Sequence, residues 1–258
     1  MRSATPPTPS SFRRDLPSPV PPHPVDAMLT PSRAHKYRQV LARRTGAVAV
    51  ILEECYDPHN ATAIIRSCDA FGIQRLFVVA NRNGFKVNRK ISQGSHHYVD
   101  ILLHPDIGSC YAAARAMGYR ILASDLGVQS VVGPGRLAEE NKTQPLALVF
   151  GTEGAGLSPA GSQQADGHFL IPMIGFPQSL NLSVSVAIAL YALRREALEE
   201  DLPGDLSAES QCRIYDTWVR EHKGQAAEKL LATIGRHGEE LDVYRARSPA
   251  ADADSAGA

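Results

Sequence analysis

Residues that could take part in binding or catalysis lie in three short segments of this chain of 258 residues. The first segment contains Asn60 and Arg66, within a run whose apolar residues recur at the spacing of an α-helix. A guanidinium stays protonated in proteins, so Arg66 could hold an anion or stabilise a negative charge that develops during a reaction. An ordinary surface arginine that pairs with Asp69, three residues further along, would show the same spacing.

The second segment is rich in glycine and follows the apolar run that ends at Phe150. Gly151 and Gly156 would let the backbone approach a ligand closely, and Glu153 between them could accept a hydrogen bond from that ligand or orient an arginine. A plain tight turn explains the pattern equally well. Leu157 stands where a phosphate-binding loop has its lysine, so we expect no nucleoside triphosphate site.

The third segment begins with an irregular loop, because Pro172 and Gly175 interrupt regular structure. Ser179 and Asn181 then place polar groups at the start of a helix. That helix is apolar or small on nearly every side, which predicts burial against several neighbours. A subunit interface and a crowded core both fit this composition, whereas a membrane span does not fit its length.

Alternating strand-like and helix-like runs connect the three segments. We predict strands at residues 47–53, 76–80, 97–103, 119–124, 146–150 and 169–171, and helices at residues 60–71, 107–117 and 181–196, with a final helical stretch within 207–234. Asn60 is placed to cap the first helix. Residues 133–138 match a dinucleotide fingerprint, but Pro145 follows too soon for a long helix, so we expect a turn there. This order predicts an α/β fold with a mostly parallel sheet covered by helices, and a ligand site beyond the carboxyl ends of the strands.

Composition limits the domain organisation. Residues 1–27 contain eight prolines and little apolar periodicity, so we predict a disordered tail, and we expect residues 236–258 to be disordered as well. The folded domain is expected over residues 28–235, with helical extensions at both ends. The chain has no apolar run of membrane-spanning length, no secretory signal and four widely spaced cysteines, which predicts a soluble, cytoplasmic protein without a membrane or metal partner.

Charge is balanced overall but not locally. The 27 lysines and arginines match 27 acidic residues, which argues against a purely electrostatic nucleic-acid binder. Basic residues nevertheless gather at 33–44 and 82–90, while acidic residues gather at 196–205. The basic stretches are compatible with local binding of a polyanion, and equally with solvated surface faces.

Taken in order, the three segments resemble the SpoU branch of the SPOUT RNA 2′-O-ribose methyltransferases. The resemblance extends from about residue 28 to residue 231 and is carried by DPHNATAIIRSCDAFGI (57–73), LVFGTEGAGLS (148–158) and IPMIGFPQSLNLSVSVAIAL (171–190). Within that branch, the chain is most similar to the enzymes that methylate guanosine 18 in the D-loop of tRNA. The resemblance implies a SPOUT-type α/β fold with a C-terminal trefoil knot, a homodimer, tRNA as the partner and S-adenosylmethionine as the cofactor.

The resemblance also implies roles for individual residues. Catalysis would depend on Arg66, assisted by Asn60, Glu153, Ser179 and Asn181, and the cofactor would be held by Ser124, Leu126, Gly151, Ile171, Met173 and Leu180. Our own candidates for contacts with RNA phosphates are the basic residues Arg33, Lys36, Arg38, Arg43, Arg44, Arg194 and Arg195.

The residues leave two questions open. Arg66 could act as a base after strong perturbation, or as a clamp for the alkoxide and a phosphate; we favour the clamp because guanidinium groups stay protonated. A ribosomal RNA methyltransferase of the same branch is the alternative function, and a non-catalytic RNA-binding protein on the same fold is a second one. The short structured stretch expected before Ala47 favours tRNA, because many of the ribosomal enzymes carry an extra RNA-binding domain there.

Overall fold

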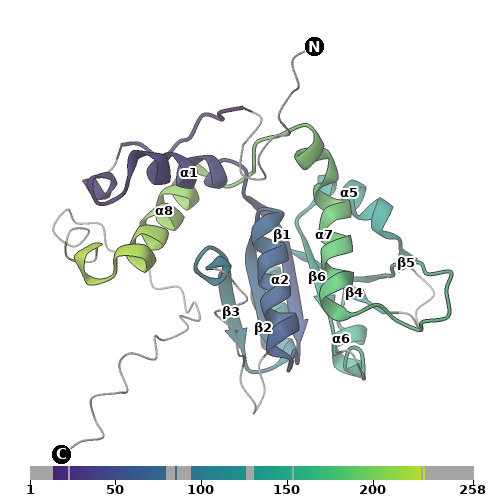
Figure 1. Ribbon diagram of the computed structural model, residues 1–258. Helices are drawn as coiled ribbons and strands as arrows, with labels where there is room; N and C mark the ends of the chain where they lie inside the picture. Colours follow the sequence, from purple (N-terminus) through teal and green to yellow (C-terminus); the bar gives the residue numbers. More distant parts are fainter. Residues whose placement is uncertain are drawn as a thin grey trace, which may run out of the picture.

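The computed structural model describes residues 14–22, 24–79, 85, 94–125, 131–152, 154–227 and 229. Within these residues seven strands form one sheet in the order β3-β2-β1-β6-β4-β7-β5, and all neighbouring strands run parallel (Figure 1). The strands are β1 (Thr45–Glu53), β2 (Ile73–Val79), β3 (Asp100–His104), β4 (Arg120–Ser124), β5 (Val131–Val132), β6 (Leu146–Phe150) and β7 (Gly167–Phe169). The predicted α/β fold with a parallel sheet is confirmed.

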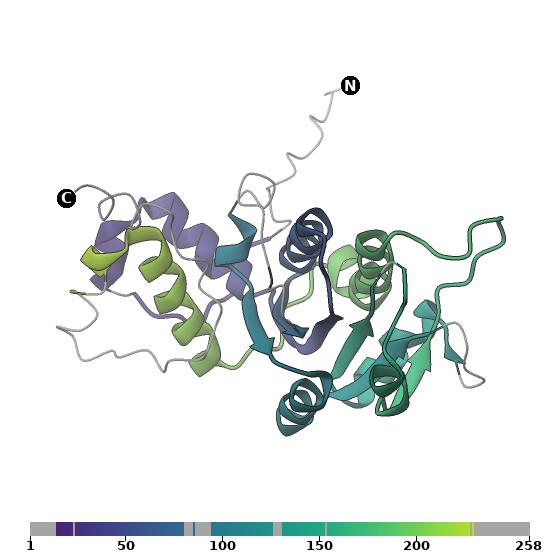
Figure 2. The ribbon, with the colours of Figure 1, turned by 90° about the horizontal axis from the view of Figure 1, so that it is seen from below.

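Helices cover both faces of this sheet (Figure 2). On one face lie α2 (Pro58–Ala70) and α7 (Leu182–Glu199), and on the other lie α4 (Ile107–Ala116) and α6 (Pro159–Gln163). Another helix, α5 (Pro134–Thr143), packs against α7. The central strands β1, β2 and β6 are mostly apolar and largely buried, because parallel strands covered on both faces bury their side chains in both directions.

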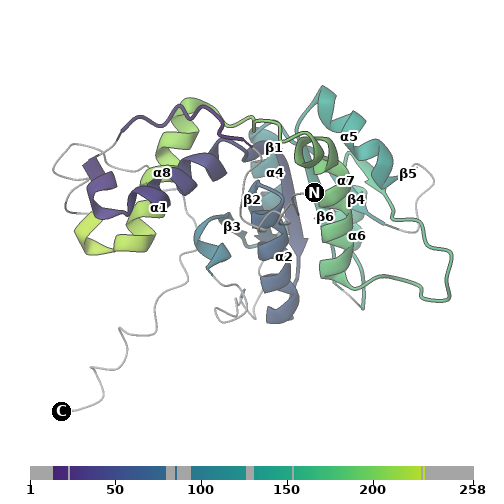
Figure 3. The same cartoon turned by 45° about the horizontal axis from the view of Figure 1, so that its top comes forward.

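A smaller apolar cluster lies beyond the β3 edge of the sheet. There α1 (Pro31–Leu41) and α8 (Ala208–Lys223) pack together, although they come from opposite ends of the chain (Figures 1 and 3). Tyr37 and Trp218 meet edge to face in this cluster, with 5.5 Å between their ring centroids. The final helical stretch therefore packs back onto the rest of the chain.

The proline-rich start of the chain packs onto the same cluster. Leu16, Val20 and Val25 are buried, and the side chain of Gln39 makes two hydrogen bonds of 2.9 Å with the backbone of Leu16. A short 3-10 helix, η1 (Pro24–Met28), follows. The prediction of disorder is therefore wrong for residues 14–22 and 24–27. Prolines reduce the conformational entropy that is lost on ordering, and the apolar residues between them pack against α1 and α8. Residues 1–13 and 236–258 lie outside the described residues.

The start of α2 differs from its prediction. Asp57, rather than Asn60, caps this helix, because its carboxylate accepts a hydrogen bond of 2.8 Å from the backbone N of His59. Pro58 occupies the first helical position, which its fixed φ suits. Asn60 consequently lies inside the first turn, where it is buried.

Three other local predictions also change. The turn expected at 133–138 is wrong, because residues 134–143 form α5, again with a proline at the first helical position. The strand expected from residue 97 starts at Asp100, after the short 3-10 helix η2 (Ser95–His97). The strand expected at 169–171 ends at Phe169, in register with Ser124 of β4. The trefoil knot stays a prediction.

Candidate active site

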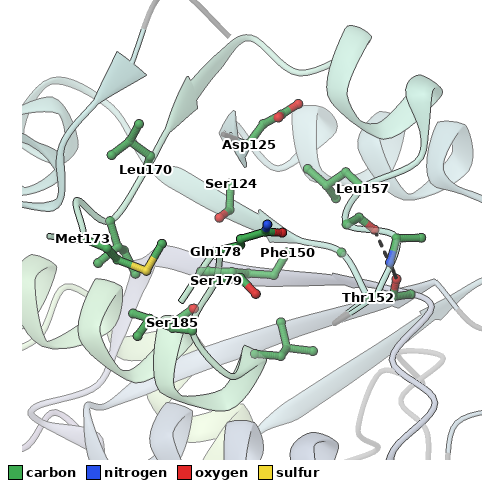
Figure 4. A pocket seen from close by; sticks show the side chains of 17 residues that line it. Ser124, Asp125, Phe150, Thr152, Leu157, Leu170, Met173, Gln178, Ser179 and Ser185 are labelled. Carbon is green, nitrogen blue, oxygen red and sulfur yellow. Dashed lines mark hydrogen bonds between the residues drawn. The ribbon is translucent and has the colours of Figure 1, made fainter. Parts of the chain in front are cut away.

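The carboxyl ends of β4, β6 and β7 meet at one edge of the sheet, and a cavity of about 370 Å³ lies there (Figure 4). Five of the residues expected to hold the cofactor line this cavity, namely Ser124, Gly151, Ile171, Met173 and Leu180. The sixth, Leu126, lies outside the described residues. Ser179, expected to be catalytic, lines the same cavity together with Ser185 of α7.

Two glycines shape the wall of this cofactor cavity. Thr152 and Gly156 exchange backbone hydrogen bonds of 2.9 and 3.0 Å, which fold the loop after β6 back on itself. A Cβ on Gly151 would overlap the carbonyl oxygen of Gly156, so a side chain does not fit there. Gly156 itself has a φ of +68°. The loop after β6 is therefore both the tight turn that the sequence allows and a wall of the cofactor cavity. Glu153 lies outside the described residues.

A second cavity, of about 580 Å³, adjoins the first. The two share Leu182 and the loop residues 152 and 154–157. Residues 53–57, at and after the end of β1, also line the second cavity, together with Asn60 from α2 and residues 158–159. Both volumes are of the size that small-molecule sites have.

Asn181 joins the third segment of the sequence to the first. Its side-chain oxygen accepts hydrogen bonds from the backbone N of Ser183 and Val184, at 2.9 and 3.3 Å, and so caps α7. Its side-chain nitrogen donates to the side-chain oxygen of Asn60, which is 3.2 Å away. Because Asn60 is only 6% exposed, this contact links α2 and α7 at a buried point beside the second cavity.

Arg66 occupies a different position. It is exposed on α2 and lines neither of the two cavities. Asp69, the partner that an ordinary surface arginine would take, accepts a hydrogen bond from Arg44. The structure therefore places Asn60 and Ser179 at the cavities, with Asn181 bonded to Asn60, while the catalytic role of Arg66 stays a prediction.

A buried carboxylate that the sequence analysis did not single out supports the glycine loop. Glu53, 6% exposed, accepts hydrogen bonds from the backbone N and the hydroxyl of Ser158, at 2.8 and 2.7 Å. The Ser158 oxygen in turn accepts a hydrogen bond from the backbone N of Gly161 and so caps α6. The signal in the sequence was an acid at the end of an otherwise apolar strand.

A second group that the sequence analysis missed lies at the cofactor cavity. Asp125 lines the cavity directly after β4, and the hydroxyl of Ser162 donates to its Oδ2, 2.5 Å away. His168 Nε2 lies 3.1 Å from the carbonyl oxygen of Ser162, which can only accept, so this nitrogen carries a hydrogen. The same nitrogen is 3.2 Å from the Ser162 hydroxyl. The hydrogen bonds therefore run in one direction, from His168 through Ser162 to Asp125.

Most of the basic residues expected to contact RNA have partners inside the protein. Arg38 pairs with Asp26, Arg43 with Asp201 and Arg44 with Asp69, while Arg194 donates to the carbonyl oxygens of Phe71 and Arg43. The acidic stretch 196–205 thus supplies one of the partners of the basic stretch 33–44.

Burial decides which of these arginines can reach a phosphate. The Arg44 side chain is 0% exposed, and burial lowers its pKa while the carboxylate of Asp69 opposes that effect. Burial also lowers the pKa of Arg194. The prediction of a phosphate contact is therefore wrong for Arg44, and Arg38, Arg43 and Arg194 are held by intramolecular bonds. Arg33, Lys36 and Arg195 are exposed, although the guanidinium of Arg33 also contacts the ring of His222. The cations of the second basic stretch, 82–90, lie outside the described residues.

Two kinds of feature bear on membrane and metal partners, namely membrane-spanning helices and groups of metal-ligating side chains. No helix among the described residues is both long and apolar enough to cross a membrane. In that part of the chain no three side chains of His, Cys, Asp or Glu gather as a group that could hold a metal ion. Cys68 and Cys110 are buried free thiols, and burial raises the pKa of each to about 12.

Known proteins share both the sequence pattern and the fold. Residues 47–191 match the SpoU rRNA Methylase family. A tRNA (guanosine(18)-2'-O)-methyltransferase of Thermus thermophilus is 32% identical over 194 residues, which cover 74% of this chain and 98% of the relative. The crystal structure of a TrmH/SpoU tRNA modifying enzyme from A. aeolicus has a TM-score of 0.66 and 32% identity, and the match covers 74% of this chain and 97% of that one.

A more distant structure is an AdoMet-bound rRNA methyltransferase from Sinorhizobium meliloti, with a TM-score of 0.51 and 26% identity over 61% of this chain and 60% of that one. The family match covers more than half of the chain and includes all three segments that build the cavities. This protein therefore belongs to the SpoU methylase family.

Proposed function

We propose that this protein transfers a methyl group from S-adenosylmethionine to the ribose 2′-oxygen of guanosine 18 in the D-loop of tRNA. The observation that carries the proposal is the pair of adjoining cavities: one is lined by residues expected to hold the cofactor, and the other by Asn60 of the first segment. The relative named for guanosine-18 methylation is covered over 98% of its length, which favours tRNA over ribosomal RNA as the substrate.

The first cavity fits S-adenosylmethionine. It lies at the carboxyl ends of parallel strands, where such sheets bind their ligands. Gly151 keeps side-chain atoms away from the backbone of the loop, so main-chain groups stay within reach of a bound molecule. Ser124, Ile171 and Leu180 would hold the cofactor from the surrounding loops, with Met173 as an apolar contact. When bound, the cofactor supplies an electrophilic methyl group on a sulfonium whose thioether is a good leaving group.

The protein's own residues must act on the ribose hydroxyl, which is a poor nucleophile until its proton leaves or the alkoxide is stabilised. Ser179, from the wall of the cofactor cavity, would hydrogen-bond that hydroxyl. Asn60 and Asn181 would act as positioning residues, because the hydrogen bond between their side chains links α2 to α7. Arg66 would serve as a positive clamp for the alkoxide or a neighbouring phosphate, since a guanidinium stays protonated.

A homodimer is part of the proposal. Val184, Ile188 and Tyr191 recur at helical spacing on α7 and are exposed, and Ile174 and Phe176 in the preceding loop are fully exposed. Apolar side chains gathered in this way mark an interaction surface. A second copy of the chain would cover them, and because the loop before α7 also lines the cofactor cavity, the interface would lie beside the site.

The approach of tRNA would use the cations that the fold leaves exposed. Arg33 and Lys36 on α1 and Arg195 on α7 are the remaining candidates for phosphate contacts. A tRNA substrate would also place the protein in the cytoplasm.

Methyl transfer from labelled S-adenosylmethionine to total tRNA tests the proposal, with the native protein compared with Arg66→Ala and the modified ribose mapped afterwards. We expect 2′-O-methylguanosine at position 18, and a loss of at least about 100-fold in the variant. Arg136→Ala, at an exposed position of α5, is the matched control and should keep its activity. Methylation of ribosomal RNA alone would move the same chemistry to another substrate. No transfer to either RNA would favour the non-catalytic RNA-binding alternative.

A further inference from the structure

We propose that the hydroxyl of Ser185 binds the adenosine half of S-adenosylmethionine in the cofactor cavity. Ser185 lies near the start of α7 and lines that cavity together with Ser179 (Figure 4). This inference rests on the proposed function, and it adds a cofactor-binding residue that the sequence analysis did not assign.

The position of Ser185 on α7 is one that apolar residues otherwise fill. The side chains that α7 buries belong to the main apolar core and recur at helical spacing; they are Leu182, Val186, Ala189, Leu190 and Leu193. Ser185, which is half-buried, comes three residues after Leu182 and four before Ala189, so it shares their side of the helix. An alanine would pack equally well here, so packing against the core does not require the hydroxyl.

The Ser185 hydroxyl differs from other hydroxyls inside the helices of this protein. The hydroxyls of Thr62, Ser67 and Thr217 each donate to the backbone carbonyl four residues earlier, at 2.5, 3.0 and 3.0 Å. The corresponding carbonyl for Ser185, that of Asn181, accepts from the backbone N of Ser185, at 2.9 Å. Among the described residues, the Ser185 hydroxyl itself has no hydrogen-bond partner. It can therefore serve a molecule in the cavity, either as a donor or as an acceptor.

Charge in the cavity indicates which half of the cofactor lies against Ser185. The methionine half carries an ammonium and a carboxylate, whereas the adenosine half is neutral and offers ring nitrogens, an amino group and ribose hydroxyls. Among the described residues that line the cavity only Asp125 is charged, and it lies across the cavity from Ser185 (Figure 4). The carboxylate of Asp125 attracts the ammonium, so the methionine half would point toward it. The side of the cavity next to Ser185 and Leu182 suits the neutral half, because a charge costs more to bury beside apolar groups.

Ser185→Ala tests this contact by calorimetry with two ligands. S-adenosylhomocysteine contains both halves, whereas 5′-methylthioadenosine keeps the adenosine half and lacks the charged amino-acid end. We expect the substitution to raise the Kd of each ligand about 3–10-fold, which is the effect of losing one hydrogen bond between neutral groups. Thermal unfolding without ligand should not shift to a lower temperature, because the hydroxyl has no partner in the described part of the protein and alanine is the stronger helix former.

Methyl transfer to tRNA gives an independent readout. A bond to the adenosine half is the same in the bound complex and in the transition state, so the KM for S-adenosylmethionine should rise by a similar factor while kcat stays near the native value. Ser67→Ala is the matched control, because Ser67 is a half-buried helical serine whose hydroxyl bonds to its own helix and which lines neither of the two cavities. It should bind both ligands like the native protein.

The outcomes separate this inference from the proposed function. An unchanged Kd of Ser185→Ala for both ligands would overturn the inference alone. A weaker affinity for S-adenosylhomocysteine without a change for 5′-methylthioadenosine would also overturn it, because the hydroxyl would then contact the methionine half. Failure of the native protein to bind S-adenosylmethionine would overturn the proposed function, and this inference with it.

Discussion

Glu53 and Ser158, which are 105 positions apart in the chain, are joined by two hydrogen bonds to one carboxylate. Oε2 accepts from the backbone N of Ser158 and Oε1 from its hydroxyl, at 2.8 and 2.7 Å. The pair connects the end of β1 to the end of the glycine loop, which is the wall that the two cavities share. Because Ser158 also caps α6, three elements depend on this single buried group.

Glu53→Gln should destabilise the protein and loosen the cofactor site. The amide presents an NH2 group to one of the two donors of Ser158, and a buried donor left without an acceptor costs about 1–3 kcal/mol. We expect a decrease of that size in the free energy of unfolding in urea, with weaker binding of S-adenosylmethionine in calorimetry. In a double-mutant cycle, Glu53→Gln and Ser158→Ala should couple by more than about 0.5 kcal/mol. Strict additivity would contradict the pairing.

Ser162→Ala should weaken cofactor binding without unfolding the protein. The variant removes the hydroxyl that donates to Asp125 and so leaves the carboxylate at the cofactor cavity without its fixed orientation. Because Ser162 would act only by orienting Asp125, the loss of this one hydrogen bond should raise the Kd for S-adenosylmethionine by about 3–10-fold. Ser32→Ala, exposed on α1, is the control. An unchanged Kd in both Ser162→Ala and Asp125→Asn would show that Asp125 does not contact the cofactor.

Arg44 and Lys36 should respond differently to substitution, although both belong to one basic stretch. Arg44→Ala removes the partner of Asp69 from a buried site, which should cost about 3 kcal/mol of stability or more. Lys36→Ala should leave stability nearly unchanged and lower the affinity for tRNA. The slope of log affinity against log salt should fall by about 1 for each phosphate that the variant no longer neutralises. Filter binding over a salt series measures this, and a slope unchanged by both Lys36→Ala and Arg195→Ala would remove these residues from the RNA surface.

Acid should weaken the link between Arg43 and Asp201. Arg43 donates to both oxygens of Asp201, at 2.7 and 3.0 Å, and this hydrogen bonding is the main reason that the pKa of Asp201 lies below its ordinary value of 3.8. A carboxyl group whose pKa is lower in the folded state stabilises the fold above pH 3.8, and that stabilisation disappears as the pH falls through the folded pKa.

Asp201→Asn tests this pH dependence with little change of shape. Asp201 has a φ of +52°, a left-handed conformation that asparagine also tolerates. Urea unfolding should show the variant to be less stable than the native protein at pH 7, with the difference shrinking as the pH falls below 3.8. A difference that stays constant over this range would mean that the charge of Asp201 contributes nothing to stability.

Much of the fold and of the cofactor site could be predicted from the spacing of residues that lie close together in the chain. The apolar run before Glu53, the helical spacing after Asn60 and the glycines after Phe150 each depend on residues close together in the chain. For such segments the pattern alone indicates the element and its boundary, because periodicity and backbone conformation are local properties. Since all strands of a parallel sheet end on the same side, Gly151 and Ile171 could be expected at one cavity from the order of the elements.

Only the tertiary structure decided which side chains are buried and which residues they contact. Nothing near Arg44 in the chain distinguishes it from Lys36, yet one lies in the core beside Asp69 and the other faces solvent. Val25 likewise is buried only because helices from both ends of the chain pack in the same cluster. The free energy of a charge or an apolar group is set by what surrounds it, and those surroundings come from segments that can be more than a hundred residues away.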